Sequence, residues 1–166
     1  MHHHKNIILI GMPGAGKSTV GVILAKSLGV QFIDTDILIQ ERTGKMLQAI
    51  LDEDGPDAFK RVEEETILSL HPRRAVVATG GSVVCSRNAM AHLKSAGVVV
   101  YLEISYAEME KRLKNITTRG MVLLPGQSLR GMYDERVPLY EKYADLTIGC
   151  SGERFESVVG NVIEAL

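Results

Sequence analysis

Eight residues near the N-terminus have the spacing with the clearest chemical meaning in the chain. Residues 11–18 read Gly-Met-Pro-Gly-Ala-Gly-Lys-Ser. Glycines let the backbone turn tightly, so that its N–H groups point inward at the oxygens of a phosphate. The lysine can reach the β- and γ-phosphates of a nucleotide, and the hydroxyl that follows can ligate Mg²⁺. The pattern predicts a phosphate-binding loop; the alternative is a glycine-rich turn without function.

The segments on either side of this loop favour the phosphate-binding interpretation. An apolar run at residues 7–10 is typical of a buried strand, and a helical pattern follows at residues 18–28. The N-terminus of that helix adds a field that favours an anion. The loop residues assigned to the nucleotide are Gly11, Gly14, Ala15, Gly16, Lys17, Ser18 and Thr19.

Two carboxylates follow the second predicted strand, in Asp34-Thr35-Asp36. Ligands sit at the C-terminal ends of the strands in open parallel sheets. Two residues apart on an extended chain, the carboxylates would share a face. One could then hold metal-bound water beside a Mg²⁺-phosphate, and the other could accept a proton from a substrate hydroxyl. The alternative is an aspartate that caps a helix beginning at residue 37.

The other candidates are a glycine pair and three arginines. Gly80 and Gly81 follow a third strand, where they form either a plain turn or a stretch of bare backbone that approaches a ligand. Arg112, Arg119 and Arg136 could neutralise phosphoryl charge or grip a carboxylate in a bidentate fork. The alternative for each arginine is a solvated surface charge.

Strands and helices alternate along the chain and must position these residues. Apolar segments predict strands at residues 5–10, 30–33, 75–79, 98–104 and 146–148. Helical patterns cover residues 18–28, 37–43, 46–52, 56–71, 87–95, 106–113, 129–143 (interrupted near Pro138) and 154–165. Five apolar strands interleaved with helices predict an α/β fold of three layers, with a parallel sheet covered on both faces. Residues 115–129 contain glycine and proline and predict a mobile lid that excludes water.

Length and composition exclude several classes of protein. The 166 residues suit one domain, expected over residues 1–166, in which residues 1–4 are a disordered N-terminus or a tag remnant. A net charge of −1 without a basic stripe argues against binding to nucleic acid or to a membrane surface. No apolar stretch approaches the ~20 residues of a membrane span. Cys85 and Cys150 predict reduced thiols in a cytoplasmic protein, which we expect to be a monomer.

Together these motifs resemble those of the shikimate kinase family, over nearly all of residues 5–165. The resemblance is carried by the phosphate loop, Phe-Ile-Asp-Thr-Asp, Thr-Gly-Lys, Thr-Gly-Gly and Arg-Val-Pro-Leu-Tyr-Glu-Lys-Tyr-Ala-Asp. Asp-Thr-Asp in combination with the Arg-x-Pro-Leu-Tyr segment is its most specific part. It implies a P-loop kinase fold with sheet order 2-3-1-4-5 and a mobile lid. It also implies ATP and Mg²⁺ as cofactors and phosphoryl transfer to the 3-hydroxyl of shikimate, in aromatic amino-acid biosynthesis.

The resemblance also implies a role for each matching residue. Lys17, Asp36 and Arg119 would be catalytic, with Asp36 holding the acceptor hydroxyl and Arg119 reaching in from the lid. Asp34 and Ser18 would serve the metal, and Arg112 would lie near the adenine. The residues implied to bind the acceptor are Asp36, Lys60, Gly80, Gly81, Ser82 and Arg136, of which Arg136 would grip the substrate carboxylate.

Three departures from the family pattern lie on the acceptor side or in the lid. Lys60 follows Phe59 where the family usually has arginine, and lysine keeps the charge but loses the fork. Arg61 comes next, but one helical residue turns it away by about 100°. Ser82 replaces a third glycine, and residues 119–124 read Arg-Gly-Met-Val-Leu-Leu instead of Arg-Pro-Leu-Leu. A different small hydroxylated acid is therefore the alternative acceptor.

A remote alternative is a nucleotide-dependent regulatory protein without a small acceptor. A GTPase of that kind would need an Asn-Lys-x-Asp motif to read its base, and the sequence has none. A second carboxylate at Asp36 would also have no evident task in such a switch.

Overall fold

The computed structural model describes residues 5–114, 123 and 126–166. Within these residues the strands are β1 (Asn6–Ile10), β2 (Gln31–Asp34), β3 (Ala75–Ala78), β4 (Gly97–Glu103) and β5 (Leu146–Gly149). The helices are α1 (Lys17–Leu28), α2 (Thr35–Thr43), α3 (Leu47–Asp54), α4 (Pro56–Leu68), η1 (Val83–Cys85, a 3₁₀ turn), α5 (Arg87–Ala96), α6 (Tyr106–Lys114), α7 (Leu129–Tyr143) and α8 (Phe155–Ala165).

The strands pair in parallel in the order β2-β3-β1-β4-β5, which confirms the expected sheet. All five residues of β1, the central strand, are buried. Such complete burial requires helices on both faces, which explains why the strand is continuously apolar rather than alternating. The C-terminal ends of β1, β2 and β3 therefore meet at one edge of the sheet, where the phosphate loop, Asp34-Thr35-Asp36 and Gly80-Gly81 lie.

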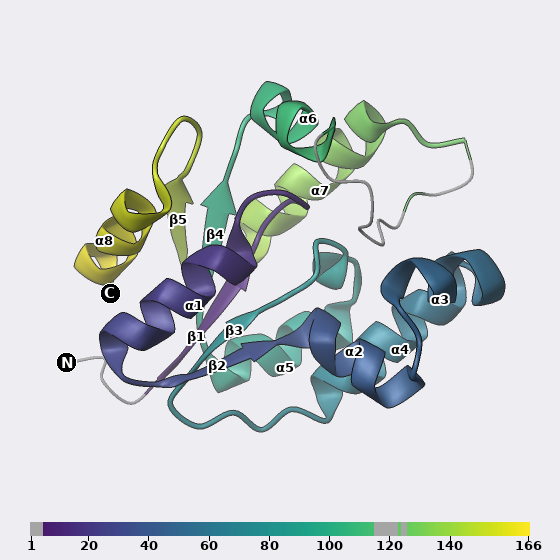
Figure 1. The fold of residues 1–166 in the computed structure, drawn as a ribbon, viewed down its shortest axis with the longest axis horizontal. Coiled ribbons are helices and arrows are strands. Elements are labelled where there is room, and N and C mark those ends of the chain that lie inside the picture. The colour runs from purple at the N-terminus through teal and green to yellow at the C-terminus, as the bar shows by residue number, and fades with distance from the viewer. Residues whose placement is uncertain (1–4, 115–122, 124–125) are drawn as a thin grey trace.

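Helices cover both faces of the sheet (Figure 1). Helix α1 contacts α8 and the strands β1, β2 and β3, whereas α5 and α7 contact β4. In the view of Figure 1, α1 lies in front of the strands and α5 lies behind them. The main core between the layers is aliphatic, with a stacked pair of buried rings, Tyr101 and Tyr140, between β4 and α7.

Helices α2, α3 and α4 form a second group beside the sheet (Figure 1). They contact one another and enclose a small core of their own, built around Ile39, Ile50 and Phe59. Helix α4 also contacts α5 and η1, so the group is attached to the main layers through the segment after β3. This attachment brings α2 and α4 to the C-terminal ends of the strands.

Three helices differ from the expectation in ways that have a physical reason. Helix α2 begins at Thr35, because Asp34 ends β2 and caps the helix directly. Helix α4 ends at Leu68, three residues before the expected end, where Ser69 caps it. Helix α7 continues through Pro138, although an interruption was expected there. Pro138 lies on the exposed side of the helix, so water can solvate the carbonyl that has lost its N–H partner.

Two further expectations concern the lid and the membrane. Most of the expected lid, including Arg119, lies outside the described residues, as do residues 1–4. None of the helices that the structure describes has the length and apolar character needed to cross a membrane.

Candidate active site

The loop between β1 and α1 has the backbone conformation that the glycine spacing predicts. Gly11, Gly14 and Gly16 all have positive φ (151°, 82° and 92°), a region that residues with a Cβ rarely adopt. A Cβ on Gly11 would also lie only 2.6 Å from the carbonyl oxygen of Leu102. The Ala15 N–H donates to the Met12 carbonyl (3.1 Å) and tightens the turn. The loop is thus shaped for close approach of a ligand to backbone.

Lys17 follows the loop glycines and opens α1. Its ammonium donates to the carbonyls of Gly11 and Met12, at 2.7 Å each, and the side chain is buried. Helix α1 has no acidic residue in its first turn, so the positive end of the helix dipole is not offset there. A buried cation and a helix N-terminus at one loop form a site for an anion, as expected for nucleotide phosphates.

Ser18 and Asp34 form a pair of oxygen donors beside the loop. The Ser18 hydroxyl donates to Asp34 Oδ2 (2.7 Å), while Asp34 Oδ1 accepts the N–H groups of Asp36 (2.9 Å) and Ile37 (3.4 Å). Asp34 therefore caps α2 with one oxygen and contacts Ser18 of the phosphate loop with the other, so the cap does not conflict with the predicted metal role. The donor set fits Mg²⁺, which binds hard oxygens and takes one or two protein ligands beside waters and phosphates. Among the described residues there is no cluster of three or more acidic, histidine or cysteine side chains that could hold a metal.

Asp36 does not share a strand face with Asp34, which corrects that expectation. It stands in the first turn of α2. A Cβ on Gly80, after β3, would lie 3.0 Å from Asp36 Oδ1. Helix formation directly after Asp34 rotates the two carboxylates apart. One faces the phosphate loop, and the other faces the end of β3.

The pair Gly80-Gly81 joins the two sides of the site. A Cβ on Gly81 would lie 2.8 Å from Cδ of Pro13, in the phosphate loop, whereas one on Gly80 would meet Asp36 and Glu63. Gly81 thus contacts the phosphate loop, and its neighbour Gly80 contacts the two acidic side chains. Both positions require a residue without a side chain because of this close approach.

Glu63 of α4 is a site residue that sequence reasoning missed. It is 3% exposed, and its Oε1 accepts a hydrogen bond from the Ser82 hydroxyl (2.7 Å). Its Oε2 has no hydrogen-bond partner among the described residues and would lie 2.7 Å from a Cβ on Gly80. Burial raises the pKa of Glu63 to about 7 and the charge of Asp36 adds to the rise, whereas the Ser82 hydrogen bond and the charges of Arg136 and Lys60 oppose it.

A signal for Glu63 was present in the sequence. Phe59, Glu63 and Ile67 follow one another at intervals of four residues on the buried side of α4, with a carboxylate between two apolar side chains. Burial of an acid on an otherwise apolar helix face is unusual enough to indicate a specific role. Ser82 and Lys60, which lie near Glu63, are residues that the resemblance predicts for this side of the site.

Two cations accompany the carboxylates on this side. Arg136 of α7 is buried and lies close to the Tyr140 phenol, which in turn donates to the carbonyl of Gly81 (2.5 Å). Lys60 is half-buried and lines a cavity of about 420 Å³ together with Glu63 and Ser82. The structure therefore brings together all the residues assigned to the acceptor: Asp36, Lys60, Gly80, Gly81, Ser82 and Arg136.

Arg112 lies on the opposite side of the phosphate loop. Its guanidinium donates to the carbonyl of Gly14 (3.0 Å) and to Glu108, one turn earlier in α6. Phe155, which opens α8, is 40% exposed, and its ring lies 2.7 Å from the position of a Cβ on Gly16. Thr19 is exposed in the first turn of α1. Arg112 and Phe155 thus lie against the loop glycines on the side away from Gly81.

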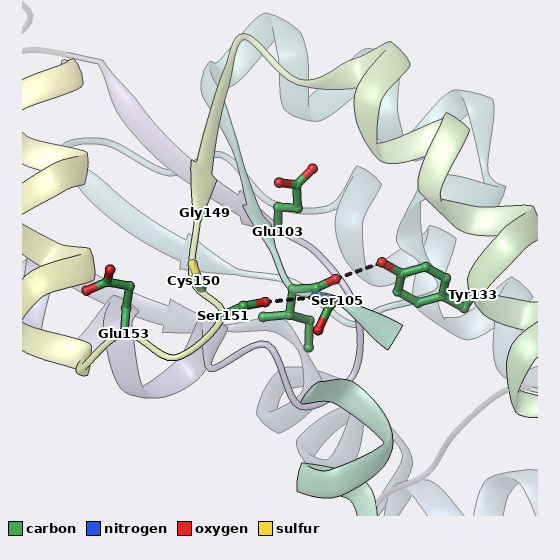
Figure 2. Close-up of a pocket in the computed structure, with 8 residues that line it drawn as sticks. Glu103, Ser105, Tyr133, Gly149, Cys150, Ser151 and Glu153 are labelled. Carbon is green, nitrogen blue, oxygen red and sulfur yellow. Dashed lines mark hydrogen bonds between the residues drawn. The ribbon is translucent and has the colours of Figure 1, made fainter. Parts of the chain in front are cut away.

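A separate cavity of about 360 Å³ lies at the ends of β4 and β5 (Figure 2). The Tyr133 phenol donates to the Ile104 carbonyl (2.8 Å), and the Ser105 N–H donates to the Ser151 hydroxyl (2.9 Å). Figure 2 shows these two bonds connecting the loop after β4 to α7 and to the loop after β5. None of the residues assigned to the site from the sequence lines this cavity.

Comparison with known proteins identifies close relatives along the whole length of the chain. The family model described as "Shikimate kinase" matches residues 13–166. A shikimate kinase of Thermobifida fusca is 42% identical over 148 residues, which are 87% of this chain and 84% of the relative. One of Thermodesulfovibrio yellowstonii is 39% identical over 163 residues, 96% of this chain and 94% of the relative.

Solved structures agree with the sequence relatives. The shikimate kinase of Acinetobacter baumannii in complex with shikimate matches with a TM-score of 0.89 and 32% identity. The match covers 97% of this chain and 92% of that one. The chain thus shares its overall fold with a shikimate kinase whose solved structure contains shikimate.

Proposed function

Since the chain belongs to the shikimate kinase family, we propose that it transfers the γ-phosphoryl group of ATP to the 3-hydroxyl of shikimate. The observation that carries the proposal is the contact made by Gly80-Gly81. Gly81 packs against Pro13 of the phosphate loop, and Gly80 packs against Asp36. A phosphate held by the loop and a hydroxyl held by Asp36 would therefore lie next to each other, as phosphoryl transfer requires.

On the donor side, backbone N–H groups and positive charges would bind the nucleotide. The glycine loop and the N-terminus of α1 would bind the phosphates. Lys17 would stabilise the negative charge that develops on the transferring group. Ser18 and Asp34 would hold Mg²⁺, which neutralises phosphate charge when it is bound. Arg112 would border the adenine. Arg119 remains a prediction as a second cation at the transferred group.

On the acceptor side, the charges are arranged for a hydroxylated acid. Asp36 would orient the reacting hydroxyl and accept its proton. Arg136, buried beside Tyr140, would bind the carboxylate of the acceptor, and Lys60 would add a second positive charge. Asp36 stands on α2 and Arg136 on α7, so the two would bind different ends of a small ring.

The first experiment is a coupled ADP-release assay with MgATP and shikimate. A panel of other small hydroxy acids and a reaction without acceptor are run beside it. Shikimate-dependent release with a Michaelis constant in the usual micromolar to millimolar range is expected. ADP release with another acceptor but not with shikimate would refute shikimate as the substrate, while the protein would still be a kinase. Release without any acceptor requirement would refute the transferase.

A different hydroxylated acid is the second candidate, favoured by Lys60 and Ser82. Lys60→Arg restores a planar fork at this position and should lower the Michaelis constant for shikimate several-fold. The matched control is Lys26→Arg, on the exposed last turn of α1, which should change nothing. A loss of shikimate affinity in Lys60→Arg would count against shikimate as the natural acceptor.

We further propose a cytoplasmic monomer. Cys85 and Cys150 are both free thiols, which suits a reducing compartment. Light scattering on the purified protein measures the mass in solution, and a stable dimer would contradict the monomer.

A further inference from the structure

A buried hydrogen bond joins the segment after β3 to helix α4. The Ser82 hydroxyl donates to Oε1 of Glu63 at 2.7 Å, and both side chains are almost completely buried, at 5% and 3% exposed. Buried polar groups of this kind are normally satisfied by specific partners. Ser82 is also the position at which this chain departs from the family's run of glycines.

The second oxygen of Glu63 is directed at the acceptor side. Oε2 has no hydrogen-bond partner among the described residues. It lies 2.7 Å, and Asp36 Oδ1 lies 3.0 Å, from the position that a Cβ on Gly80 would occupy. A buried acceptor atom without a donor is costly, so a bound molecule that supplies one is stabilised there.

Charged groups approach Glu63 from each element around it. Asp36 comes from α2, Lys60 from the preceding residues of α4, and Arg136 from α7. The carboxylate cannot move freely among them, because it stands on a helix and Ser82 holds one of its oxygens. Without that hydroxyl, Glu63 could rotate toward either cation and remove Oε2 from Gly80.

We propose that Ser82 is a positioning residue of the acceptor site. Its hydroxyl holds Oε1 of Glu63, so that Oε2 stays beside Gly80 and Asp36 and accepts a hydrogen bond from a hydroxyl of the bound acid. The inference rests on the proposed function, because the acceptor is the molecule that supplies the missing donor. Ser82 thereby contributes to the recognition of a hydroxylated acid without touching it.

Removal of the Ser82 hydroxyl has a consequence that can be measured. A hydrogen bond donated to a carboxylate favours its ionised form, so its loss raises the pKa of Glu63 further. At neutral pH the protonated carboxyl would then present a different hydrogen-bonding pattern to the acceptor. The pH at which acceptor binding weakens on acidification should therefore be higher in the variant.

The kinetic test uses Ser82→Ala, with Ser82→Thr as the variant that keeps the hydroxyl. In Ser82→Ala we expect the KM for the acceptor to rise about tenfold at pH 7 with a smaller change in kcat. The acidic limb of kcat/KM should move up by about half a pH unit or more. Ser82→Thr should restore both. An unchanged KM together with an unmoved limb would overturn the proposal.

Ser86→Ala is the matched control. Ser86 donates to Glu64, the neighbour of Glu63, and also caps α5. This variant loses a serine–glutamate bond and some stability, and it should leave the pH profile in place. A shift of the profile in Ser86→Ala equal to that in Ser82→Ala would mean that destabilisation alone causes it, and would also overturn the proposal.

A second measurement needs no turnover. Carboxyl carbons of ¹³C-labelled glutamate are followed by NMR against pH, with Glu63 assigned by its absence in Glu63→Gln. Glu63 should titrate higher in Ser82→Ala than in the wild type; if Ser82→Ala does not fold, Ser82→Gly replaces it. An identical titration refutes the role of Ser82. If shikimate is not phosphorylated, the proposed function fails, while this titration and the KM for the accepted hydroxy acid still decide the role of Ser82.

Discussion

Glu63 shows how a single side chain couples the acceptor site to the stability of the fold. A carboxylate 3% exposed is costly to ionise, and here burial outweighs the hydrogen bond from Ser82 and the nearby cations, so that its pKa rises to about 7. The folded state therefore binds a proton more tightly at Glu63 than the unfolded chain does. The contribution of Glu63 to the unfolding free energy is greatest at pH values below the ordinary pKa of a glutamate. It is lost as the pH rises from there to about 7.

Glu63→Gln should remove this pH dependence. The unfolding free energy of the variant relative to the wild type should increase between pH 5 and pH 8, by on the order of 2–3 kcal/mol. Urea unfolding at both pH values measures the difference. Glu64→Gln is the control, because hydrogen bonds from Ser86 and Asn88 lower the pKa of Glu64, so that its contribution to stability changes below its ordinary pKa and hardly at all between pH 5 and pH 8. A pH-independent difference for Glu63→Gln would show that Glu63 ionises normally.

At the scale of the element, α2 depends on the residue that also serves the phosphate loop. Asp34 ends β2, caps α2 through the N–H groups of Asp36 and Ile37, and accepts from Ser18. The same carboxylate thus caps the helix through Oδ1 and reaches the expected metal site through Oδ2. A substitution at Asp34 can separate these two tasks.

Asp34→Asn should keep the cap and lose the charge. Its melting temperature should stay near that of the wild type, while the Mg²⁺ concentration needed for half-maximal activity should rise. Asp34→Ala should show the same Mg²⁺ effect and lose about 1 kcal/mol of stability as well. Ser86→Ala, which removes the cap of α5, controls for the loss of a cap alone. A normal Mg²⁺ requirement in Asp34→Asn would refute the metal role.

The glycine pair after β3 should separate donor from acceptor effects. A Cβ at Gly80 would meet Glu63 and Asp36, and one at Gly81 would meet Pro13. Gly80→Ala should therefore raise the KM for the acceptor, and Gly81→Ala that for ATP, each about 10- to 100-fold. Gly149→Ala, where a Cβ would meet nothing within 4 Å, is the control. Equal effects of both substitutions on both substrates would contradict this division.

The same elements show what the sequence could predict. The phosphate loop was predictable because its glycines and Lys17 lie within eight positions, where spacing alone determines geometry. The sheet order came from a resemblance and was confirmed. The placement of Asp36 was wrong, because the cap at Asp34 starts α2 before the strand geometry can apply. The contact of Glu63 with Ser82 joins residues 19 positions apart, so no local pattern could predict it.

At the scale of the whole molecule, the two sides of the site belong to two parts of the core. The phosphate loop sits on the main core between the sheet and α1, whereas Asp36 and Glu63 stand on α2 and α4, which enclose the smaller core around Phe59. The nucleotide and the acceptor would therefore contact largely different residues. Each ligand should therefore still raise the unfolding free energy when a residue that binds the other ligand is substituted.

Thermal unfolding with MgATP alone tests this division through Lys17. At a hundredfold excess over its dissociation constant, a ligand adds ~2.7 kcal/mol, which is about 5–10 °C for a chain of this size. Lys17→Met should lose most of this nucleotide shift, together with several orders of magnitude of turnover, because the loop loses its cation. The shift produced by shikimate should persist in the variant, since no acceptor residue has changed. Lys26→Met, exposed on the far end of α1, should behave as the wild type in both titrations. A full MgATP shift in Lys17→Met would place the nucleotide elsewhere, and loss of the shikimate shift would show that Lys17 also contributes to acceptor binding.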